Sequence, residues 1–480
     1  MNHETRRDRL GRIRHQRAHS EKSALLWKEY QWGIDYRLND IIDHLEDKRT
    51  AFEYDDRGYL IRAIYDRKEE QFRTADKLGN LYETKNKTDR KYTNSQLQQD
   101  RTYYYHYDVE GNLIFKEHIK DVGYRPVFSG GELRDRGIQP KSTGKGFLYT
   151  WNANGSLRSV TDLKGVTYRF RYDAFGRRLE KRRMASTFRF VWDGNVLLHE
   201  TFKRDNSEHT ELTTWVFEGF VPTAKLVNGK AYSIISDHLG TPILAIDSEG
   251  NEVWNRQLDI YGRVKREIKA SSLGEDVGPF IPFLYQGQYY DFETNLAYNR
   301  FRYYSPETGA YISQDPIRLN GNNPNLYAYV GNNNLWVDVF GLKLLLPEAP
   351  TYSGVYHIVG DDGKKYVGSA VNIRERLESN AHPKAAEIIN SGNYTITFHE
   401  VSLGKIDPAD KENRSLVNHV LRYHEDDIFD GQGYEPKKDN VQNANRPMAD
   451  KKQAEYEKEV KEHNVHFTGK KDSKTCKKQS

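Results

Sequence analysis

The stretch "FEYDDRGYLIRAIYD", Phe52 to Asp66, contains the unit that decides the fold. Asp55 and Asp56 are followed by Gly58, three and two positions on, and then by a β-like run. An aspartate carboxylate accepts hydrogen bonds from the backbone N–H groups of a turn, and glycine supplies a positive φ. Alternating residues beyond the glycine give one buried face. The unit therefore predicts a strand, a tight turn and a second strand.

The same unit recurs at irregular spacing through the first two thirds of the chain. Clear copies are "HYDVEGNLIFKEH", "YTWNANGSLRSVTD" and "RYDAFGRRLEKRR", which begin at His106, Tyr149 and Arg171. Degenerate copies are "TADKLGNLYET", "ISDHLGTPILAID", "IDSEGNEVW" and "LDIYGRVKREI". One hairpin alone is marginal in water, so such units must stack side by side. We therefore expect a long antiparallel sheet, which the first fifty residues extend with further strands.

Composition supports a β-rich chain of more than one domain. At 480 residues two or three units are expected. The 33 tyrosines and 36 glycines, against 3 methionines, favour strands joined by tight turns. The net charge of +4 does not by itself indicate nucleic acid, and the single cysteine, Cys476, excludes an internal disulfide. No stretch approaches the ~18 apolar residues of a membrane span, and the basic N-terminus lacks the apolar run of a secretion signal.

A stretch of about sixty residues carries a specific resemblance. It reads "FLYQGQYYDFETNLAYNRFRYYSPETGAYISQDPIRLNGNNPNLYAYVGNNNLWVDVFGL", from Phe283 to Leu342. It resembles the end of the core of the Rhs/YD-repeat family of polymorphic toxins over its whole length. The resemblance implies that residues 1–342 form an encapsulating β-shell around a variable C-terminal toxin. Relatives usually have a much longer core, so this chain is expected to be a shell fragment or an orphan module.

The resemblance also implies self-cleavage. In relatives two Asp-Pro-x-Gly-like elements form an aspartate-dependent site that releases the toxin; here they are "DPIR" from Asp315 and "DVFGL" from Asp338, with release after Leu342. Two carboxylates that share a proton can activate water, as in aspartic proteases. Arg318 replaces the usual glycine and Val339 the usual proline, and an arginine beside a carboxylate lowers that carboxylate's pKa. The simpler interpretation is a plug and turn that close the shell.

The chain after Leu342 predicts a second, mixed α/β domain. Residues 343–352 are a proline-broken linker, and "GVYHIV" and "KKYVGSAV" are β-runs joined by the turn "GDDG". A helix begins near Asn372, "NYTITFHEVSL" is a third strand, and a second helix begins at Asp407 with an apolar face. The domain is expected to span residues 353–460. The lysine-rich residues 461–480 are expected to be a disordered tail.

This order of elements resembles the GIY-YIG nuclease superfamily. The resemblance rests on Gly354-Val355-Tyr356, on Tyr366-Val367-Gly368, and most specifically on "YVGSA" with "RERL". It implies that Tyr356 and Tyr366 lie near the scissile phosphate and that Arg376 clamps phosphate oxygens. Two tyrosines across a hairpin are also ordinary packing, and a lone arginine is usually a surface charge.

The resemblance further implies a metal ligand and supporting residues. Glu412 matches the single carboxylate that would hold one Mg²⁺ or Mn²⁺ together with waters and substrate phosphate. A glutamate early in a helix is also favoured by the helix dipole alone. The residues in supporting positions are Gly354, Gly368, Ser369, His382 and Asn445.

Together these features predict an antibacterial effector: a β-shell followed by a metal-dependent DNA endonuclease. Family context implies synthesis in the cytoplasm, delivery into a target bacterium by a type VI-like secretion apparatus or upstream delivery domain, and a cognate immunity protein. No membrane partner is expected. Two alternatives remain open: a nuclease that cuts RNA, and a shell or interaction protein with a degenerate, inactive GIY-YIG fold.

Overall fold

The computed structural model describes most of the shell region and parts of the tail. The described residues are 2–8, 12–33, 37–271, 278–318, 325–342, 353–360, 364–370, 394–407 and 450–476, with 373, 388, 413, 416, 417, 419–421 and 424. The chain divides into two compact units, Met1–Arg318 with Asn323–Lys343, and Leu319–Asn322 with Leu344–Ser480. Within the described ranges, no helix has both the length and the apolar composition needed to cross a membrane.

The first unit begins with a seven-stranded antiparallel sheet whose strands pair in chain order. Its strands are β1 (Asn2–Arg7), β2 (Ile13–His19), β3 (Ala24–Trp32), β4 (Leu38–Asp43), β5 (Lys48–Tyr54), β6 (Leu60–Tyr65) and β7 (Glu69–Phe72). A two-stranded pair follows, β8 (Thr74–Ala75) with β9 (Leu81–Tyr82). The strands predicted for the first fifty residues are therefore confirmed.

A sixteen-stranded sheet follows, and its strands again pair in strict chain order and antiparallel throughout. Its strands are β10 (Lys91–Thr93), β11 (Gln96–Gln99), β12 (Tyr103–Tyr107), β13 (Leu113–His118), β14 (Gly146–Trp151), β15 (Leu157–Thr161), β16 (Thr167–Tyr172), β17 (Arg178–Arg183), β18 (Ser186–Asp193), β19 (Val196–Arg204), β20 (Thr210–Glu218), β21 (Val221–Val227), β22 (Lys230–Ser236), β23 (Pro242–Ile246), β24 (Glu252–Leu258) and β25 (Val264–Lys269). The short helix α1 (Gly130–Asp135) interrupts the meander between β13 and β14.

The repeated Asp and Gly build the turns of this meander in one way. At Asp162, Oδ1 accepts the N–H groups of Lys164 (2.8 Å) and Val166 (2.9 Å), and the carbonyl accepts the N–H of Gly165 at 3.0 Å. Gly165 has a φ of +80°, where a side chain would be strained. Asp55, Asp76, Asp173, Asp237, Asp247 and Asp259 cap their turns with the same pattern. The turn chemistry predicted from the repeat is confirmed.

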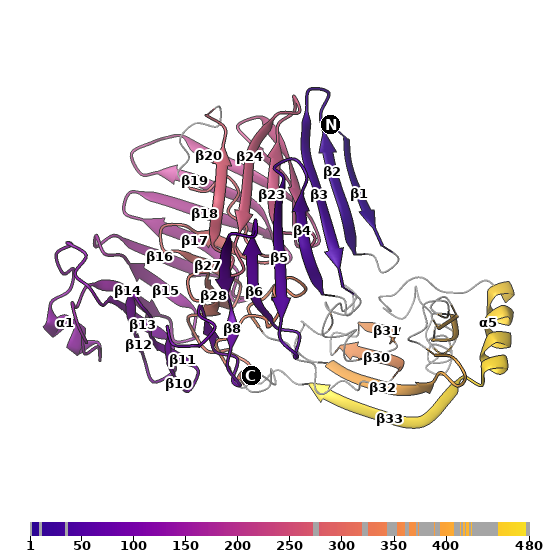
Figure 1. Cartoon of the computed structure of the whole chain (residues 1–480). Coiled ribbons are helices and arrows are strands. Elements are labelled where there is room, and N and C mark those ends of the chain that lie inside the picture. The colour runs from indigo at the N-terminus through magenta and orange to yellow at the C-terminus, as the bar shows by residue number, and fades with distance from the viewer. Residues whose placement is uncertain are drawn as a thin grey trace. The chain divides into compact units, whose positions relative to one another are not determined.

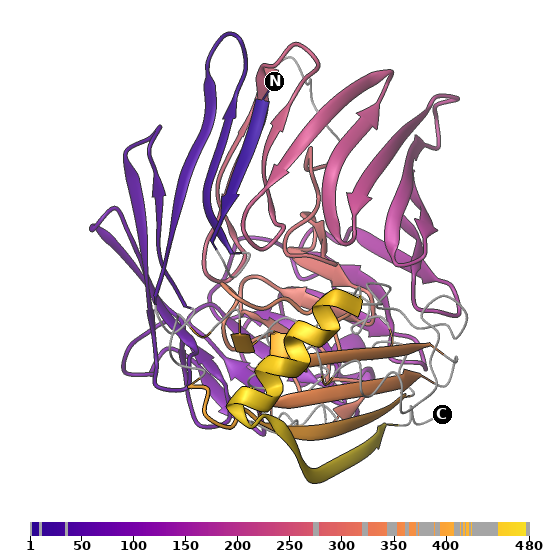
Figure 2. The same cartoon turned by 90° about the vertical axis from the view of Figure 1, so that its right-hand side faces the viewer.

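The seven-stranded and sixteen-stranded sheets contact each other and together form a curved wall in the first unit (Figures 1 and 2). Apolar side chains of β2 and its neighbour β3 join those of β22 and β23 in one cluster, which consists of Ala18, Leu25, Leu26, Ile235, Ile243, Leu244 and Ile246. Gln16 adds a polar link, since its Nε2 donates to the carbonyl of Ser236 at 2.8 Å. Segments over two hundred residues apart in sequence thus close on one another.

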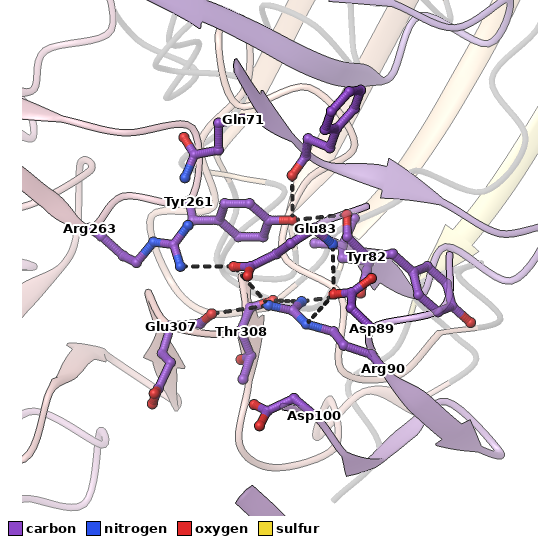
Figure 3. Close-up of polar contacts among 12 residues, drawn as sticks. Gln71, Tyr82, Glu83, Asp89, Arg90, Asp100, Tyr261, Arg263, Glu307 and Thr308 are labelled. Carbon is purple, nitrogen blue, oxygen red and sulfur yellow. Dashed lines mark hydrogen bonds and ion pairs between the residues drawn. The ribbon is translucent and has the colours of Figure 1, made fainter. Parts of the chain in front are cut away.

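A polar cluster joins the segment between β9 and β10 to the later chain. Arg90 donates to the carbonyl of Thr308 at 2.8 Å and lies 3.2 Å from the carboxylate of Glu83; Figure 3 shows these residues. The same carboxylate accepts a hydrogen bond from Nη1 of Arg263, in the turn before β25, at 2.8 Å. Arg90 is buried, so its charge is satisfied by these partners rather than by water. The cluster ties three distant segments of the first unit together.

Inside the wall lies a small four-stranded antiparallel sheet made by the stretch after Phe283. Its strands are β26 (Tyr289–Asp291), β27 (Leu296–Asn299), β28 (Arg302–Ser305) and β29 (Ala310–Tyr311). One face packs on the aromatic inner face of the large sheet through Tyr289, Tyr298 and Tyr303. The other face carries Tyr304 and Tyr311 and is covered by Tyr329, Val330, Trp336 and Val337. Residues 325–342 therefore lie over the inner sheet.

The second unit contains one four-stranded antiparallel sheet. Its order is β31-β30-β32-β33, with β30 (Gly354–Gly360), β31 (Lys365–Ala370), β32 (Tyr394–Ser402) and β33 (His466–Cys476). Ile373 and Ile388, both helical, pack on one face of the sheet. Val417, Val420 and Leu421, together with Val460 of helix α5 (Asp450–His463), pack on the other face. The predicted hairpin and third strand are present, and the expected apolar face of the second helix is buried.

The expectation of a disordered tail over residues 461–480 is wrong for most of that range. Helix α5 reaches His463, and β33 pairs with β32 from His466 to Cys476. The lysine-rich composition misled the prediction, because an edge strand has one side in water and tolerates lysines. Pairing with β32 supplies the backbone hydrogen bonds that the segment lacks alone.

Candidate functional site

The two predicted self-cleavage elements are brought together beside the inner sheet. Asp338 is buried, and its Oδ1 accepts the N–H groups of Phe340 (3.3 Å) and Leu342 (3.0 Å). These donors are two and four residues beyond the aspartate, as in the repeat turns, and Gly341 has a φ of +65°. The "DVFGL" element is therefore built as one more turn of the repeat, and it holds the backbone at Leu342.

Asp315 lies in a second turn of similar form. Its Oδ1 accepts the N–H of Ile317 at 3.0 Å, and its carbonyl accepts the N–H of Arg318 at 2.8 Å. Arg318 has a φ of +51°, so it keeps the left-handed conformation that glycine would adopt with less strain. The side chain of Arg318 is exposed. The replacement of glycine by arginine thus keeps the backbone of the turn.

Arg302, at the start of β28, forms ion pairs with the carboxylates of both Asp315 and Asp338. Its Nη2 atom lies 3.0 Å from Oδ2 of Asp315 and 3.4 Å from Oδ2 of Asp338. Its Nε donates to the carbonyl of Gly341. Because all three side chains are buried, this cation balances two charges that have little access to water. The two aspartates are bridged by a guanidinium.

A tyrosine and an asparagine complete the surroundings of Asp338. Tyr311 donates its hydroxyl to Oδ2 of Asp338 at 2.8 Å, and Asn299 donates to that hydroxyl at 2.8 Å and to the Asp338 carbonyl at 2.7 Å. Burial and the negative charge of Asp338 raise the pKa of Tyr311, so its hydroxyl remains a donor. The Arg302 guanidinium lies over the Tyr311 ring, 3.7 Å from its centroid. The carboxylate of Asp338 is thereby held in one orientation.

Sequence reasoning identified the aspartates but not the residues that orient them. Arg302, Asn299 and Tyr311 come from three different strands of the inner sheet, whereas the arginine considered in the sequence, Arg318, is exposed. The pairs Asn299 with Arg302 and Tyr304 with Tyr311 follow from strand register. Nothing in the local sequence marks that register, so no signal within a single motif could have found them.

In the second unit the structure brings the two motif tyrosines together. Tyr356 on β30 and Tyr366 on β31 stack with ring centroids 6.1 Å apart. Tyr356 is fully buried and Tyr366 is 5% exposed, in a cluster with Ile358, Ile396 and Phe398 among others. Their role in catalysis stays a prediction, and their burial also suits the packing interpretation.

The motif glycines have steric reasons in the hairpin. A Cβ on Gly368 would lie 2.7 Å from the Tyr356 hydroxyl, and one on Gly354 would overlap the carbonyl of His399 on β32. Gly368 is paired with Tyr356 in the register of the hairpin, and Ser369 with Val355. The space beside Tyr356 thus depends on glycine at position 368.

The remaining predicted nuclease residues lie outside the described residues. They are Arg376, His382, Glu412 and Asn445, and the linker 343–352 lies outside as well. Among the residues that the structure does describe, no three His, Cys, Asp or Glu side chains gather as metal ligands would. The assignments of Arg376 and Glu412 therefore still rest on the sequence.

The fold and the closing element define a class of protein. A long meander with recurring Asp-x-x-Gly turns, wound around an inner sheet and closed by a final aspartate turn, is a YD-repeat shell. The family model described as "Teneurin YD-shell" matches residues 1–335. The chain belongs to this family, which confirms the YD-repeat core inferred from the sequence.

Known proteins similar to this chain include named toxins. The "Probable deoxyribonuclease RhsA" of Dickeya dadantii is 32% identical over 254 residues, covering 51% of this chain and 16% of that protein. The "Double-stranded DNA deaminase toxin A" of Burkholderia cenocepacia is 28% identical over 392 residues, covering 71% and 25%. The chain therefore spans a quarter or less of the length of these relatives. A solved TcdB2-TccC3-TEV structure matches at 19% identity and a TM-score of 0.42, covering 71% of this chain and 20% of that one.

Proposed function

We propose that the chain is an antibacterial Rhs effector whose residues 353–460 form a GIY-YIG endonuclease that hydrolyses DNA phosphodiester bonds. The observation that carries this proposal is the hairpin of β30 and β31, which puts Tyr356 and Tyr366 on one face beside Gly368. The family assignment adds support, because proteins named as toxins are similar to this chain over 51% and 71% of its length. Delivery by a secretion apparatus into a target cell and a cognate immunity protein belong to the same proposal.

The chemistry proposed for the tail assigns one task to each residue. Arg376 neutralises charge on the scissile phosphate, and either Tyr356 or Tyr366 orients or deprotonates the attacking water. Glu412 supplies the carboxylate, a ligand type that Mg²⁺ and Mn²⁺ accept, and the bound ion would polarise the phosphate. Gly354, Gly368, Ser369, His382 and Asn445 are proposed to shape the site around them.

The test compares the full chain with single variants on plasmid DNA and on tRNA, with and without EDTA. We expect metal-dependent nicking of plasmid that Arg376→Ala and Glu412→Ala abolish. Arg374→Ala is the matched control and should keep activity, since residues two apart on the helix predicted from the sequence face different sides. Cleavage of tRNA alone would favour the RNA nuclease, and activity unchanged in both catalytic variants would refute the assignment.

We further propose that the shell cleaves its own chain between Leu342 and Lys343. Three contacts support this: Asp338 accepts the N–H of Leu342, Arg302 donates to the adjacent Gly341 carbonyl, and Asp315 shares the same guanidinium. Arg302 is thus placed one residue from the carbonyl on which negative charge would develop. The alternative, that this element only closes the shell, uses the same contacts.

Mass spectrometry of the purified full chain separates the two interpretations. Self-cleavage predicts a fragment that ends at Leu342, and Asp338→Asn should remove it while keeping most of the side-chain shape. Asp162→Asn, in an ordinary repeat turn, is the matched control and should leave cleavage unchanged. An intact mass for the unmodified chain would retire the proposal.

A further inference from the structure

Gln288 is a buried amide whose hydrogen-bonding capacity is unused. It is 1% exposed, and within the described part of the chain neither its Oε1 nor its Nε2 has a hydrogen-bond partner. Asn299 is fully buried, and its Oδ1 likewise has no partner among those residues. A buried polar atom without a partner is destabilising, so three such atoms in two side chains require an explanation.

The two amides stand at the same end of the inner sheet. Tyr289 pairs with Tyr298 across β26 and β27. Because the strands are antiparallel, the residue before Tyr289 and the residue after Tyr298 are the next two neighbours along this ladder. Those residues are Gln288 and Asn299. Asn299 in turn pairs with Arg302 across β27 and β28. The unpaired atoms therefore lie in the row of the sheet that contains the arginine of the two aspartates.

Both amides also adjoin the closing turn. Gly287, next to Gln288, lies so close to Val339 that a Cβ there would overlap the Val339 carbonyl oxygen. The side-chain Nδ2 of Asn299 donates to the backbone carbonyl of Asp338, and the backbone carbonyl of Asn299 would overlap a Cβ on Gly341. The segment from Asp338 to Gly341 thus adjoins both the Gly287–Gln288 turn and Asn299.

We propose that Gln288 and Asn299 bind the water molecule that hydrolyses the peptide bond after Leu342. This inference rests on the self-cleavage proposed above and names the residues that hold its second substrate. An amide group offers both donors and an acceptor, and a buried water needs two to four polar partners. The Nε2 of Gln288 donates to the water oxygen, and the water donates to Asn299 Oδ1.

The reaction consumes one water and needs no other reactant. The water oxygen bonds to the carbonyl carbon of Leu342, and one water proton passes to the carboxylate of Asp338. The bond from that carbon to the amide nitrogen then breaks, and the nitrogen takes the proton to leave as an amine. Leu342 ends as a carboxyl group, and Asp338 returns to its starting state.

The decisive variant is Gln288→Met in the full chain. It removes the amide but no hydrogen bond to a described residue, and it nearly keeps the volume of the side chain, so the free energy of unfolding should not fall. Loss of a positioned reactant slows a reaction by about 100-fold, and we expect that loss in the rate at which the Leu342 fragment appears. Gln286→Met is the matched control: its Nε2 already donates to the Leu239 carbonyl at 2.6 Å, so this amide has a protein partner and cleavage should keep its rate.

The outcomes separate the inference from the proposal beneath it. If the unmodified chain is cleaved and Gln288→Met is cleaved equally fast, the water site is wrong and self-cleavage stands. If the unmodified chain is not cleaved, both fail. In an Asp338→Asn chain, which should stay intact, a crystal structure is expected to show an ordered water bonded to Gln288 and Asn299. A direct hydrogen bond between the two amides, with no water, would overturn the inference on its own.

Discussion

The main-chain N–H of Leu342 donates to Oδ1 of Asp338 at 3.0 Å. The donor lies four residues past the aspartate, as in the turns of the repeats. The shell is therefore closed by its own repeated device, and the residue after which cleavage is proposed is held by a carboxylate of the proposed site. The Asp338 carboxylate both caps a turn and lies beside the bond for which cleavage is proposed.

Replacing Arg302 should destabilise the first unit strongly. Arg302→Gln leaves the buried carboxylates of Asp315 and Asp338 without their shared cation. Breaking a buried ion pair costs about 3–5 kcal/mol, which chemical denaturation of the full chain would measure. The exposed pair of Arg182 and Asp205 provides the control, since Arg182→Gln should change stability by roughly 1 kcal/mol or less. Equal effects of the two variants would contradict the bridging role.

The contact between Gly287 and Val339 can be isolated by a pair of substitutions. Gly287→Ala meets both a φ of +82° and overlap with the Val339 carbonyl, whereas Gly155→Ala meets a φ of +78° with no described atom within 4 Å of its Cβ. Both pay the strain of the left-handed region, about 1–2 kcal/mol. We expect Gly287→Ala to lower the unfolding free energy by clearly more than Gly155→Ala. Similar losses would mean that the closing segment moves aside freely.

Restoring glycine at position 318 should stabilise the shell. Arg318 holds a φ of +51° with an exposed side chain. Relief of the left-handed strain is worth about 1 kcal/mol, reduced by the greater freedom of glycine in the unfolded chain. Thermal unfolding of Arg318→Gly should therefore show a small rise in Tm. If the same variant is cleaved at the same site, cleavage depends on the conformation of the turn and does not need the Arg318 side chain. A fall in Tm would refute the strain argument.

Acid should weaken the hydrogen bonds by which the Glu117 carboxylate holds the connection between β13 and β14. We call this carboxylate the anchor of that connection. Burial alone would raise its pKa, but hydrogen bonds from His106 and from the N–H groups of Gly144, Lys141 and Ser142 outweigh burial and lower it to about 2. Because the folded pKa is depressed, the stabilisation is complete above the unfolded value near 4.5 and is lost as pH falls through about 2.

The lowered pKa corresponds to about 3 kcal/mol at neutral pH. Glu117→Gln should therefore flatten the dependence of unfolding free energy on pH between 2 and 4.5. The exposed Glu110→Gln is its control and should leave that slope unchanged. The same slope in the Glu117 variant as in the unmodified chain would disprove the anchor.

Local sequence patterns predicted the strands and turns well, but the composition of the tail predicted its structure poorly. Asp55 with Gly58 was enough to place a hairpin, because that turn is stabilised by contacts within five residues. The run of Tyr356 and Tyr366 likewise placed β30 and β31. Residues 466–476 were missed because their stabilisation comes from pairing with β32, more than sixty residues earlier. Their own lysines indicate only solvent exposure.

The sequence by itself determined the repeat, its turns, the family and the pair Asp315 and Asp338, since each depends on short-range backbone chemistry. Only the tertiary structure decided which residues surround that pair. Arg302 and Asn299 reach the aspartates because β27 and β28 pair in one register and the last eighteen residues of the first unit's described chain, 325–342, lie over that sheet. Register depends on the sum of many side-chain contacts across strands. No single motif carries that sum.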